Sequence, residues 1–503
     1  MKNTLKRLVA AVLSLAVVFG GAAFFAQTEQ VNFADANNNS WNGKTPKYIF
    51  LFIGDGMTYP QFTAASDYLG SVQTEGKDID PSNLVFMDFP VAGNATTFDS
   101  TSFCPDSAST ATSISTGYKT LSGVINMDET KTMTYETIAE KLKKQMGYEI
   151  GVVSSVPINH ATPAAFYAHQ SSRNNYYEIG LELIKSDFDY FGGGDFLSPE
   201  GSDGTKQSIY DLAKASGYTI ANTKSDILNL TAASDKVIAI SPETVGGALP
   251  YEIDRENGEL SLADYTKKGI DVLFNDNGFF MMVEGGKIDW ACHANDAMAS
   301  IQDTIAFDDS VAEAVKFYNK YPNDTLIIVT GDHETGGMSI GFAGTKYSTY
   351  LTQLSEQAMS YEAFDSKISD YRTNSTSFDS VLLDIEKNFG LVTEARKSST
   401  SYANMVLSEY ELSKLEAAYE ISMMPKSERK LTDADYILYG GYEPLSVTVT
   451  HLLNNKSGIG WTSYSHTGIP TAVFARGLGS GMFSGSYDNT DIFVKLKSLT
   501  KVK

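Results

Sequence analysis

The sequence predicts an α/β fold in which a doubly wound, mainly parallel central sheet is flanked by helices, over one large domain at residues 47–503. Three observations support this prediction. Short apolar runs bounded by glycine recur along the chain, and amphipathic segments lie between them. The length of 503 residues suits one large domain with an insertion better than one simple core.

Four apolar runs are predicted to be strands buried on both faces of the sheet. They lie in the segments 48–56 (YIFLFIGDG), 148–163 (YEIGVVSSVPINHATP), 278–290 (GFFMMVEGGKIDW) and 325–337 (TLIIVTGDHETGG). Such runs, about four to six residues long and bounded by glycine, are typical of parallel sheets. The amphipathic segments 132–146 and 296–318 are predicted helices. Strands that alternate with helices indicate a doubly wound sheet.

Residues 340–450 differ from the rest of the chain. This region is rich in Tyr, Ser, Leu and Glu, has helical patterns at 376–390 and 408–421, and contains no unit of strand, glycine and acid. We expect a helical insertion into the main domain. The pattern leaves open whether the insertion shapes the rim of an active site or makes a subunit contact.

The first 26 residues have the layout of a secretory signal peptide. Lys2, Lys6 and Arg7 precede an apolar run that ends in small residues. A retained membrane anchor is the alternative, but the apolar run is short for a membrane span. We expect cleavage, no membrane span in the mature protein, a polar N-terminal tail at residues 27–46, and a periplasmic or extracellular location.

Charge and cysteine content narrow the functional classes. Loss of the signal peptide removes three positive charges and no negative ones, which takes the formal net charge from −22 to −25. Such an acidic surface argues against binding to nucleic acids or anionic membranes. Cys104 and Cys292 are the two cysteines, so an exported chain has no disulfide framework. They could pair once, but burial of each as a small apolar side chain is the favoured prediction.

Several predicted strand ends carry side chains that can bind metal ions. In doubly wound sheets, ligands bind beyond the carboxyl ends of the strands. A single aspartate there is more often a turn or helix cap, but four such ends together favour a site. Oxygen ligands from Asp55, Thr162 and Glu284 would suit Mg²⁺.

Histidines beside acids indicate a second kind of ligand. Asp289 and His293 are four residues apart, so on a helix they share one face and can bind one ion, although a helix-stabilising pair is the alternative. Asp332 and His333 are adjacent and can reach one ion only from an irregular turn. His466 lies in a loop, where a lone histidine is usually a surface residue. Aspartate and neutral imidazole without thiolates suit catalytic Zn²⁺. His169 and His451 have no acid beside them and are interpreted as structural.

The segment 104–120 (CPDSASTATSISTGYKT) predicts a nucleophile, Ser107, at the start of a helix. A serine nucleophile normally needs a base beside it, and the nearest histidine along the chain is His160. A Zn²⁺ ion that contacts Ser107 Oγ would lower its pKa without a histidine base. The helix N-terminus would add backbone N–H groups that face an anion.

These motifs together resemble those of the alkaline phosphatase family. In chain order they are GDGM at 54–57, DSAS at 106–109, HATP at 160–163, SR at 172–173, VEGGKIDWACH at 283–293, TGDHETGG at 330–337 and HTG at 466–468. Each motif alone is weak, but their combination in this order is specific. The resemblance covers nearly the whole mature chain.

The resemblance implies a role for each matching residue. Ser107 matches the nucleophile that forms a phosphoserine, and Arg173 matches the phosphate clamp, positioned by Asp106. The ligands of one zinc are matched by Asp289, His293 and His466, and those of a second zinc by Asp55, Asp332 and His333. Asp55 would also bridge to a magnesium bound by Thr162 and Glu284. Members of the family hydrolyse a broad range of small phosphate monoesters and commonly form homodimers.

Two positions vary within the family and bear on the third metal. Some members have Asp where this chain has His160, and Lys where it has Trp290. His160 would ligate or tune the third site and favour Zn²⁺ over Mg²⁺ there, and Trp290 cannot supply the charge of a lysine. We therefore expect activity to depend on the balance of Mg²⁺ and Zn²⁺.

Two other functions stay open from the sequence. A phosphodiesterase of the same superfamily usually carries a threonine nucleophile, and Arg173 favours a monoester because it would clamp the extra oxygens. A protein that only binds phosphate or metal has no need of Ser107. If such a protein were an enzyme that had lost its activity, some of its metal ligands should also have been lost, whereas every expected ligand is present.

Overall fold

A ten-stranded sheet forms the centre of the computed structural model, which describes residue 41 and residues 43–503. Lys44–Lys503 form one unit. The predicted signal peptide and residues 27–40 of the predicted tail lie outside the described residues. Within residues 41 and 43–503, no helix has the length and apolar character that crossing a membrane requires.

The strands, in chain order, are β1 (Tyr48–Gly54), β2 (Val91–Thr96), β3 (Glu149–Ser154), β4 (Tyr190–Gly193), β5 (Thr219–Ala221), β6 (Val237–Ile240), β7 (Phe279–Gly285), β8 (Thr325–Gly331), β9 (Glu334–Thr335), β10 (Ser339–Ile340), β11 (Ile459–Gly460), β12 (His466–Thr467), β13 (Thr471–Gly477) and β14 (Gly485–Asp488).

The helices are α2 (Tyr59–Gln73), α3 (Ser107–Thr116), α4 (Ile138–Met146), α5 (Ala161–Ala164), α6 (Tyr176–Ser186), α7 (Ile209–Ala215), α8 (Lys224–Leu228), α9 (Leu262–Leu273), α10 (Lys287–His293), α11 (Ala297–Lys320), α12 (Tyr361–Asn374), α13 (Phe378–Phe389), α14 (Glu409–Met423), α15 (Asp433–Tyr439), α16 (Pro444–Ser457) and α17 (Thr490–Thr500).

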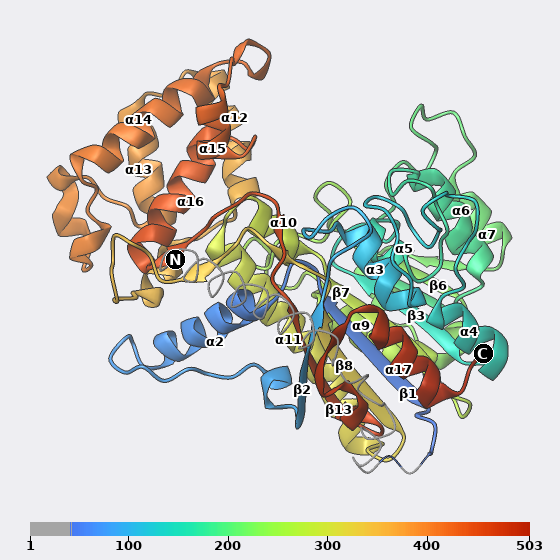
Figure 1. Cartoon of the computed structure of the whole chain (residues 1–503). Coiled ribbons are helices and arrows are strands. Elements are labelled where there is room, and N and C mark those ends of the chain that lie inside the picture. The colour runs from blue at the N-terminus through green and yellow to red at the C-terminus, as the bar shows by residue number, and fades with distance from the viewer. Residues whose placement is uncertain (1–40, 42) are drawn as a thin grey trace, which may run out of the picture. The chain divides into compact units, whose positions relative to one another are not determined.

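The sheet confirms the predicted fold class. Its strand order is β14-β2-β13-β8-β1-β7-β3-β4-β6-β5, and the seven strands from β8 to β5 are parallel. β13 runs antiparallel to both β8 and β2. The four predicted strands are β1, β3, β7 and β8, which lie side by side at the centre (Figure 1). The predicted helix at 296–318 corresponds to α11. The one predicted at 132–146 corresponds to α4, which begins only at Ile138.

Both faces of the central strands are covered, which explains their continuous apolar sequence. On β1, Phe50 and Phe52 pack with their rings against Phe317 and Phe307 of α11, at centroid distances of 5.7 and 6.0 Å. On the opposite face, Phe280 of β7 stacks on Phe166, which follows α5, at 6.1 Å. The sheet is therefore a middle layer between two groups of helices.

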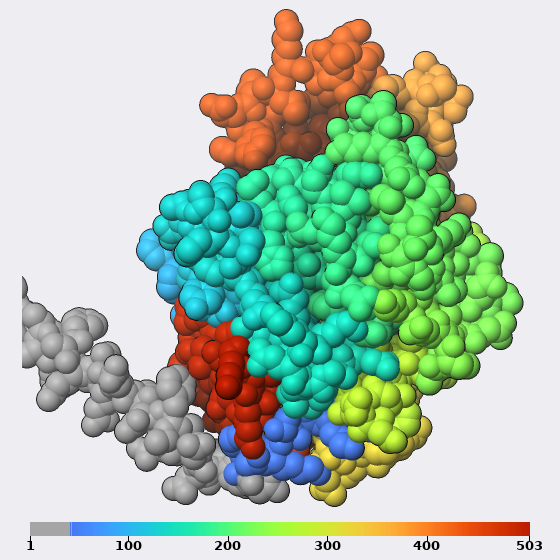
Figure 2. Space-filling view, turned by 90° about the vertical axis from the view of Figure 1, so that its right-hand side faces the viewer, coloured from blue at the N-terminus to red at the C-terminus, as the bar shows by residue number. Residues whose placement is uncertain are grey.

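The region predicted as a helical insertion contains α12 to α16. α16 packs against α12, α14 and α15, and its buried leucines join the apolar cluster of the main sheet. The predicted helices at 376–390 and 408–421 are α13 and α14. Figure 1 shows this group of helices beyond α10 and α11, and in Figure 2 it stands, in orange, above the cyan and green surface.

One cysteine prediction is wrong. Cys292 is buried in α10, as predicted, but Cys104 is exposed, and both thiols are free. Cys104 lies in the loop that leads from β2 to α3, where its N–H donates to Ser102 Oγ at 2.9 Å. Because this loop runs over the surface, the small apolar side chain has no core to enter.

Candidate functional site

The carboxyl ends of neighbouring strands bring the acidic side chains together. The last residue of β1 pairs in register with the last residues of β7 and β8. Asp55 and Asp332 follow β1 and β8 directly and so leave the sheet at the same level. Glu284 is the penultimate residue of β7. The site thus forms at the sheet edge where doubly wound folds bind ligands.

Gly56 lets the chain turn sharply after Asp55. Its φ of +70° is in the left-handed region, and a Cβ there would lie 2.9 Å from the Cα of Asp289. The Gly56 N–H donates to Asp332 Oδ1 at 3.1 Å. A glycine is therefore required for β1, β8 and α10 to meet so closely.

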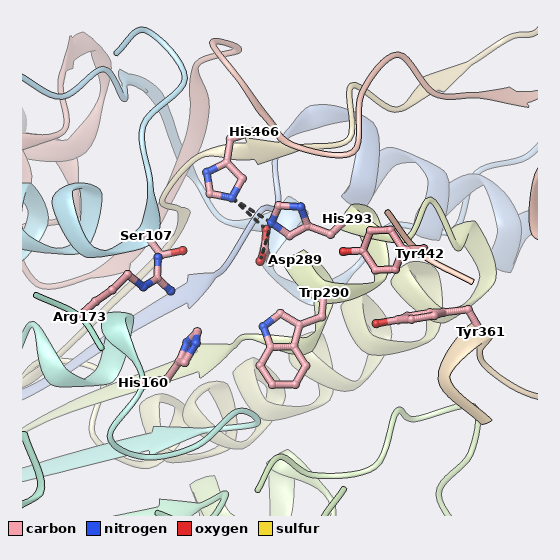
Figure 3. A pocket seen from close by; sticks show the side chains of 9 residues that line it. All are labelled: Ser107, His160, Arg173, Asp289, Trp290, His293, Tyr361, Tyr442 and His466. Carbon is pink, nitrogen blue, oxygen red and sulfur yellow. Dashed lines mark hydrogen bonds and ion pairs between the residues drawn. The ribbon is translucent and has the colours of Figure 1, made fainter. Parts of the chain in front are cut away.

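The first group of candidate metal ligands consists of Asp289 and His293, one turn apart on α10, and His466 of β12. Their ligand atoms all lie within 4.8 Å of one another. The two histidine Nε2 atoms are 3.1 Å apart, and each is near a different oxygen of Asp289, at 3.4 and 3.6 Å. The helix therefore places the i and i+4 side chains on one face, as the spacing predicts. Dashed lines join these residues in Figure 3.

Hydrogen bonds to backbone carbonyls orient both imidazoles of this group. His293 Nδ1 lies 2.6 Å from the carbonyl oxygen of Tyr464, and His466 Nδ1 lies 2.5 Å from that of Pro105. Each Nδ1 must carry the proton to donate to a carbonyl. Both Nε2 atoms are then left with a free lone pair that points at the shared centre, which is the arrangement of metal-binding histidines.

The second group consists of Asp55, Asp332 and His333, all buried, with ligand atoms again within 4.8 Å of one another. His333 Nε2 lies 3.3 Å from Asp55 Oδ1 and 3.3 Å from Asp332 Oδ2. Burial lowers the pKa of His333 well below its usual range, so the imidazole is neutral. A neutral imidazole between two carboxylates is a suitable ligand set for a divalent cation.

Ser107 begins α3 beside the second group. Its side chain is 2% exposed, and Oγ lies 3.4 Å from Asp55 Oδ1 and 3.2 Å from His333 Nε2. Asp106 caps the helix by accepting from the Ser109 N–H at 3.0 Å. The nearest imidazole in space is therefore His333, not His160, although His160 is closer along the chain.

Arg173 faces Ser107 and is fixed by Asp106. Arg173 Nη1 donates to Asp106 Oδ2 at 2.9 Å. Burial lowers the pKa of the guanidinium, but the charges of Asp106, Asp55 and Asp289 raise it more, and the net shift is upward. Burial raises the pKa of Asp106, but Arg173 and hydrogen bonds from Gly123 and Ser109 bring it below its usual range. The guanidinium is thus held in a fixed orientation with donors free for an anion.

The third set of predicted ligands surrounds the other oxygen of Asp55. Thr162 Oγ1 donates to Asp55 Oδ2 at 3.2 Å, and Ser154 Oγ donates to Glu284 Oε2. Glu284 Oε1 and His160 Nδ1 are buried and make no hydrogen bond within the described residues. A bound cation with its water would satisfy such buried polar atoms.

Uncompensated negative charge dominates the electrostatics of the site. Burial raises the pKa of Asp332 to about 8 and that of Glu284 to about 7, and repulsion from Asp289 adds to both shifts. Burial and the charges of Asp332, Asp289 and Glu284 also raise the pKa of Asp55 well above its usual range. The donor types, the two tight groups and the unsatisfied atoms fit bound cations.

A cavity of about 350 Å³ opens onto these residues. Its nine lining residues, all labelled in Figure 3, are Ser107, His160, Arg173, Asp289, Trp290, His293, Tyr361, Tyr442 and His466. Arg173 is the only one of these nine with a permanent positive charge. The residues of the second group, together with Thr162 and Glu284, are buried and do not line this cavity. His169 and His451 do not line it either.

Several residues of the site do not emerge from sequence reasoning. Thr335 Oγ1 donates to Asp289 Oδ1 at 2.6 Å and lies 3.3 Å from His333 Nδ1, so it links the two ligand groups. Thr110 Oγ1, one turn after Ser107, donates to Asp332 Oδ2 at 3.1 Å. Thr335 lies within the quoted segment 325–337, but only the folded turn shows which group its hydroxyl reaches.

Comparison with known proteins gives one consistent result. The sequence model of the alkaline phosphatase family matches residues 46–502. Alkaline phosphatase 4 of Bacillus subtilis is 28% identical over 502 residues, which cover 98% of this chain and 95% of the relative.

Two solved structures extend the comparison. The cold-active alkaline phosphatase of the psychrophile Shewanella sp. is 27% identical, with a TM-score of 0.72 over 90% of this chain and 99% of that one. A variant of the alkaline phosphatase of the Antarctic bacterium TAB5, in which glutamate replaces a histidine and Mg is bound in the M3 site, is 25% identical, with a TM-score of 0.60 over 92% of this chain and 99% of that one.

The raised carboxyl pKa values predict how the metal-free protein responds to pH. A carboxyl with a raised pKa holds its proton in the folded state after the unfolded chain has released it. Its contribution to stability is therefore present below about pH 4 and is lost as the pH rises through 7 for Glu284 and 8 for Asp332. With metal chelated, we expect the melting temperature to fall by about 5 °C or more from pH 5 to pH 9.

Two variants and a metal-loaded sample test the origin of this slope of melting temperature against pH. Restored Zn²⁺ and Mg²⁺ should flatten it, and Asp332→Asn should flatten it in the metal-free protein. Asp303, whose pKa is raised to about 8 mainly by burial, lies outside both ligand groups. Asp303→Asn should reduce the slope equally with and without metal. An identical slope in the metal-free and metal-loaded proteins would contradict the account.

Proposed function

Because the chain belongs to the alkaline phosphatase family, whose members hydrolyse phosphate monoesters, we propose that it does so through a phosphoserine on Ser107. The protein is thus a phosphoric monoester hydrolase that acts on small phosphorylated substrates. The observation that supports Ser107 most strongly is its position. A buried hydroxyl at a helix N-terminus lies beside the second ligand group, with the fixed guanidinium of Arg173 facing the same cavity.

Alkaline phosphatases are metal-dependent, and we propose two Zn²⁺ and one Mg²⁺ for this chain. Asp289, His293 and His466 would hold one zinc, and Asp55, Asp332 and His333 the other. Thr162 and Glu284, with Asp55, would hold magnesium. When bound, these ions neutralise the buried carboxylates, lower the pKa of oxygen nucleophiles and stabilise charge on the attacking and leaving oxygens.

The residues of the chain position the substrate phosphate for attack. Arg173 holds two phosphate oxygens with its fork, and Asp106 keeps the fork in place. The first N–H groups of α3 face the same anion. Ser107 Oγ releases its proton to solvent water and forms a bond to phosphorus as the bond to the leaving oxygen breaks, and the leaving oxygen takes up a proton from water. A water molecule then attacks the phosphorus, the bond to Ser107 Oγ breaks, and a proton from this water restores the Ser107 hydroxyl as inorganic phosphate is released.

His333 does not serve as the base for Ser107 in this proposal. Its Nε2 lies 3.2 Å from Ser107 Oγ, which is close enough to accept the proton. The same lone pair points between Asp55 and Asp332, and an imidazole that binds a cation through Nε2 cannot take a proton there. Loss of activity on chelation would therefore exclude a metal-free serine–histidine pair.

The occupant of the third site depends on His160 and Trp290. Burial lowers the pKa of His160 to about 3, so its ring is neutral and able to bind metal. Its ring packs edge-on against Trp290, with centroids 5.9 Å apart. The TAB5 variant with Mg in its M3 site has glutamate in place of a histidine. We propose that His160 likewise tunes which ion the third site of this chain binds. Activity then depends on the balance of Mg²⁺ and Zn²⁺.

Location and assembly follow the family. Bacterial alkaline phosphatases are typically exported, and we propose that residues 1–26 direct export of this chain to the periplasm or beyond. We also propose a homodimer and a domain at 47–503 in which residues of about 340–450 form an insertion.

Metal removal and restoration test the proposed function directly. A chromogenic phosphate monoester and its matched diester are assayed before chelation, after it, and after Zn²⁺ and Mg²⁺ are restored. We expect rapid monoester cleavage, a loss of at least about 1,000-fold on chelation, and recovery with metal. A preference for the diester would contradict the monoesterase assignment. Activity retained in chelator would contradict the role of metal.

Arg173 offers a second test. Arg173→Ala should lower kcat/KM for a monoester by about 100-fold, because it removes fixed donors from the transferring phosphoryl group. Arg173→Lys should restore only part of this loss, since an ammonium cannot hold two oxygens in a fork. Arg396, which pairs with Glu386 on the surface, gives a matched control, and Arg396→Ala should change nothing. Equal losses for monoester and diester would contradict a clamp on the extra phosphate oxygens.

A further inference from the structure

The outer half of the cavity has aromatic walls, and we propose that it is a binding subsite for a planar aromatic leaving group. The subsite consists of Trp290, Tyr361 and Tyr442. Its substrates would be phosphate monoesters that carry an aryl ring or a nucleobase. This inference rests on the proposed function, because it assumes that the phosphate binds at Ser107 and Arg173.

The position of the phosphate fixes the direction of the leaving group. Ser107 and Arg173 lie at one end of the cavity, and Asp289, His293 and His466 lie at its middle, as Figure 3 shows. In an in-line displacement the leaving oxygen points away from Ser107 Oγ. The rest of the leaving group then extends past Asp289 and Trp290 toward Tyr361 and Tyr442 at the other end (Figure 3).

Tyr361 is held rigidly at the start of α12. Its N–H donates to Asp296 Oδ2 at 2.8 Å, and the N–H of Ser360 donates to Asp254 Oδ1 at 2.8 Å. The fully buried Tyr251 packs edge-on behind it, with centroids 5.7 Å apart, and donates its hydroxyl proton to Tyr361 Oη at 3.3 Å. The hydroxyl proton of Tyr361 is then available to a ligand.

Lys287 connects α10, which carries Trp290, to α12, which carries Tyr361. The Lys287 side chain is fully buried and pairs with Glu362 of α12 at 3.2 Å. Its Nζ lies 3.5 Å from the ring centroid of Tyr251 and 4.9 Å from that of Trp290. A buried ammonium between two rings and a carboxylate holds all three in one arrangement. The subsite is therefore preorganised, which lowers the entropic cost of binding.

Tyr442 completes the subsite from the loop before α16. Its ring packs edge-on against Tyr361 at 5.9 Å and lies 6.3 Å from that of Tyr464, whose carbonyl orients His293. Within residues 41 and 43–503, the Tyr442 hydroxyl makes no hydrogen bond. Figure 3 shows the Tyr442 hydroxyl pointing toward Asp289 and the Tyr361 hydroxyl pointing toward Trp290. The wall thus offers ring faces together with two free donors.

This combination favours a planar ring with polar edges over a simple alkyl group. Aromatic side chains stack on rings and on nucleobases, and alanine substitution shows that such stacking contributes strongly to binding. Partly exposed tyrosine hydroxyls can donate to a ribose oxygen or to a nitrogen of a base. A small alkyl alcohol would reach neither feature.

Matched substrates separate the subsite from the chemistry. Adenosine 5′-monophosphate and ribose 5-phosphate release the same kind of primary alkoxide and differ in the base. We expect kcat/KM to be about tenfold or more higher for the nucleotide. 2-Phenylethyl phosphate and 2-cyclohexylethyl phosphate form a second pair, in which a planar ring replaces a puckered ring of similar size. If only the first pair shows a preference, the ring that the subsite binds belongs to a nucleoside. If only the second pair does, the ring is a simple aryl group.

Variants of the wall test the assignment of residues. Tyr361→Leu and Tyr442→Leu should bring the ratio for either preferred pair close to one, while ribose 5-phosphate is still hydrolysed. Tyr442→Phe should keep the aryl preference and lose part of the nucleotide preference. Tyr410, exposed on α14, provides the matched control, and Tyr410→Leu should leave both ratios unchanged.

Two results would overturn the inference. They are ratios near one for both substrate pairs in the unchanged protein, and ratios that survive both leucine variants. In each of these cases hydrolysis itself persists, so the proposed function stands. If none of the four esters is hydrolysed by the metal-loaded protein, the proposed function fails, and this inference fails with it.

Discussion

The site depends on one electrostatic constraint, which is the burial of several carboxylates at one edge of the sheet with too little positive charge to match them. Asp55, Asp332, Glu284 and Asp289 are buried together, and Arg173 is already paired with Asp106. Without cations, burial forces protons onto Asp332 and Glu284 at a pH where free carboxyls are ionised. Divalent metal ions remove this cost and supply the positive charge that a phosphate needs. Bound metal would therefore add to Arg173 and the N-terminus of α3 the positive charge that lets so acidic a chain bind an anionic substrate.

The fold meets this constraint through the register of its central strands. Parallel pairing of β7, β1 and β8 in register sets their carboxyl ends at one level, so that adjacent turns deliver their acids to one place. α10 and the turn at β12 add three more proposed metal ligands, and α3 brings Ser107 beside Asp55 and His333. Two helical layers and a buried aromatic core hold these strands still. The same α10 carries Trp290 outward and Lys287 inward, which connects the metal ligands to the helices of residues 361–457.

Sequence reasoning predicts the parts of this site that local periodicity controls. Asp289 and His293 share a face because they are four apart on a helix, and Asp55 and Asp332 end buried strands. Ser107 at a helix start is likewise a local prediction. The contacts of Thr335, and the arrival of Tyr361 and Tyr442 at the cavity, depend on how distant segments pack, and no local pattern encodes that. The predicted burial of Cys104 failed for the same reason, because composition does not tell which loop stays on the surface.

The most direct test of the account is to trap the covalent intermediate. The metal-loaded protein is quenched with acid during turnover of a phosphate monoester, digested, and analysed by mass spectrometry. The account predicts a peptide that carries one phosphoryl group on Ser107, absent from Ser107→Ala. A phosphoryl group on another residue, or sustained turnover by Ser107→Ala, would contradict the assignment of Ser107 as nucleophile.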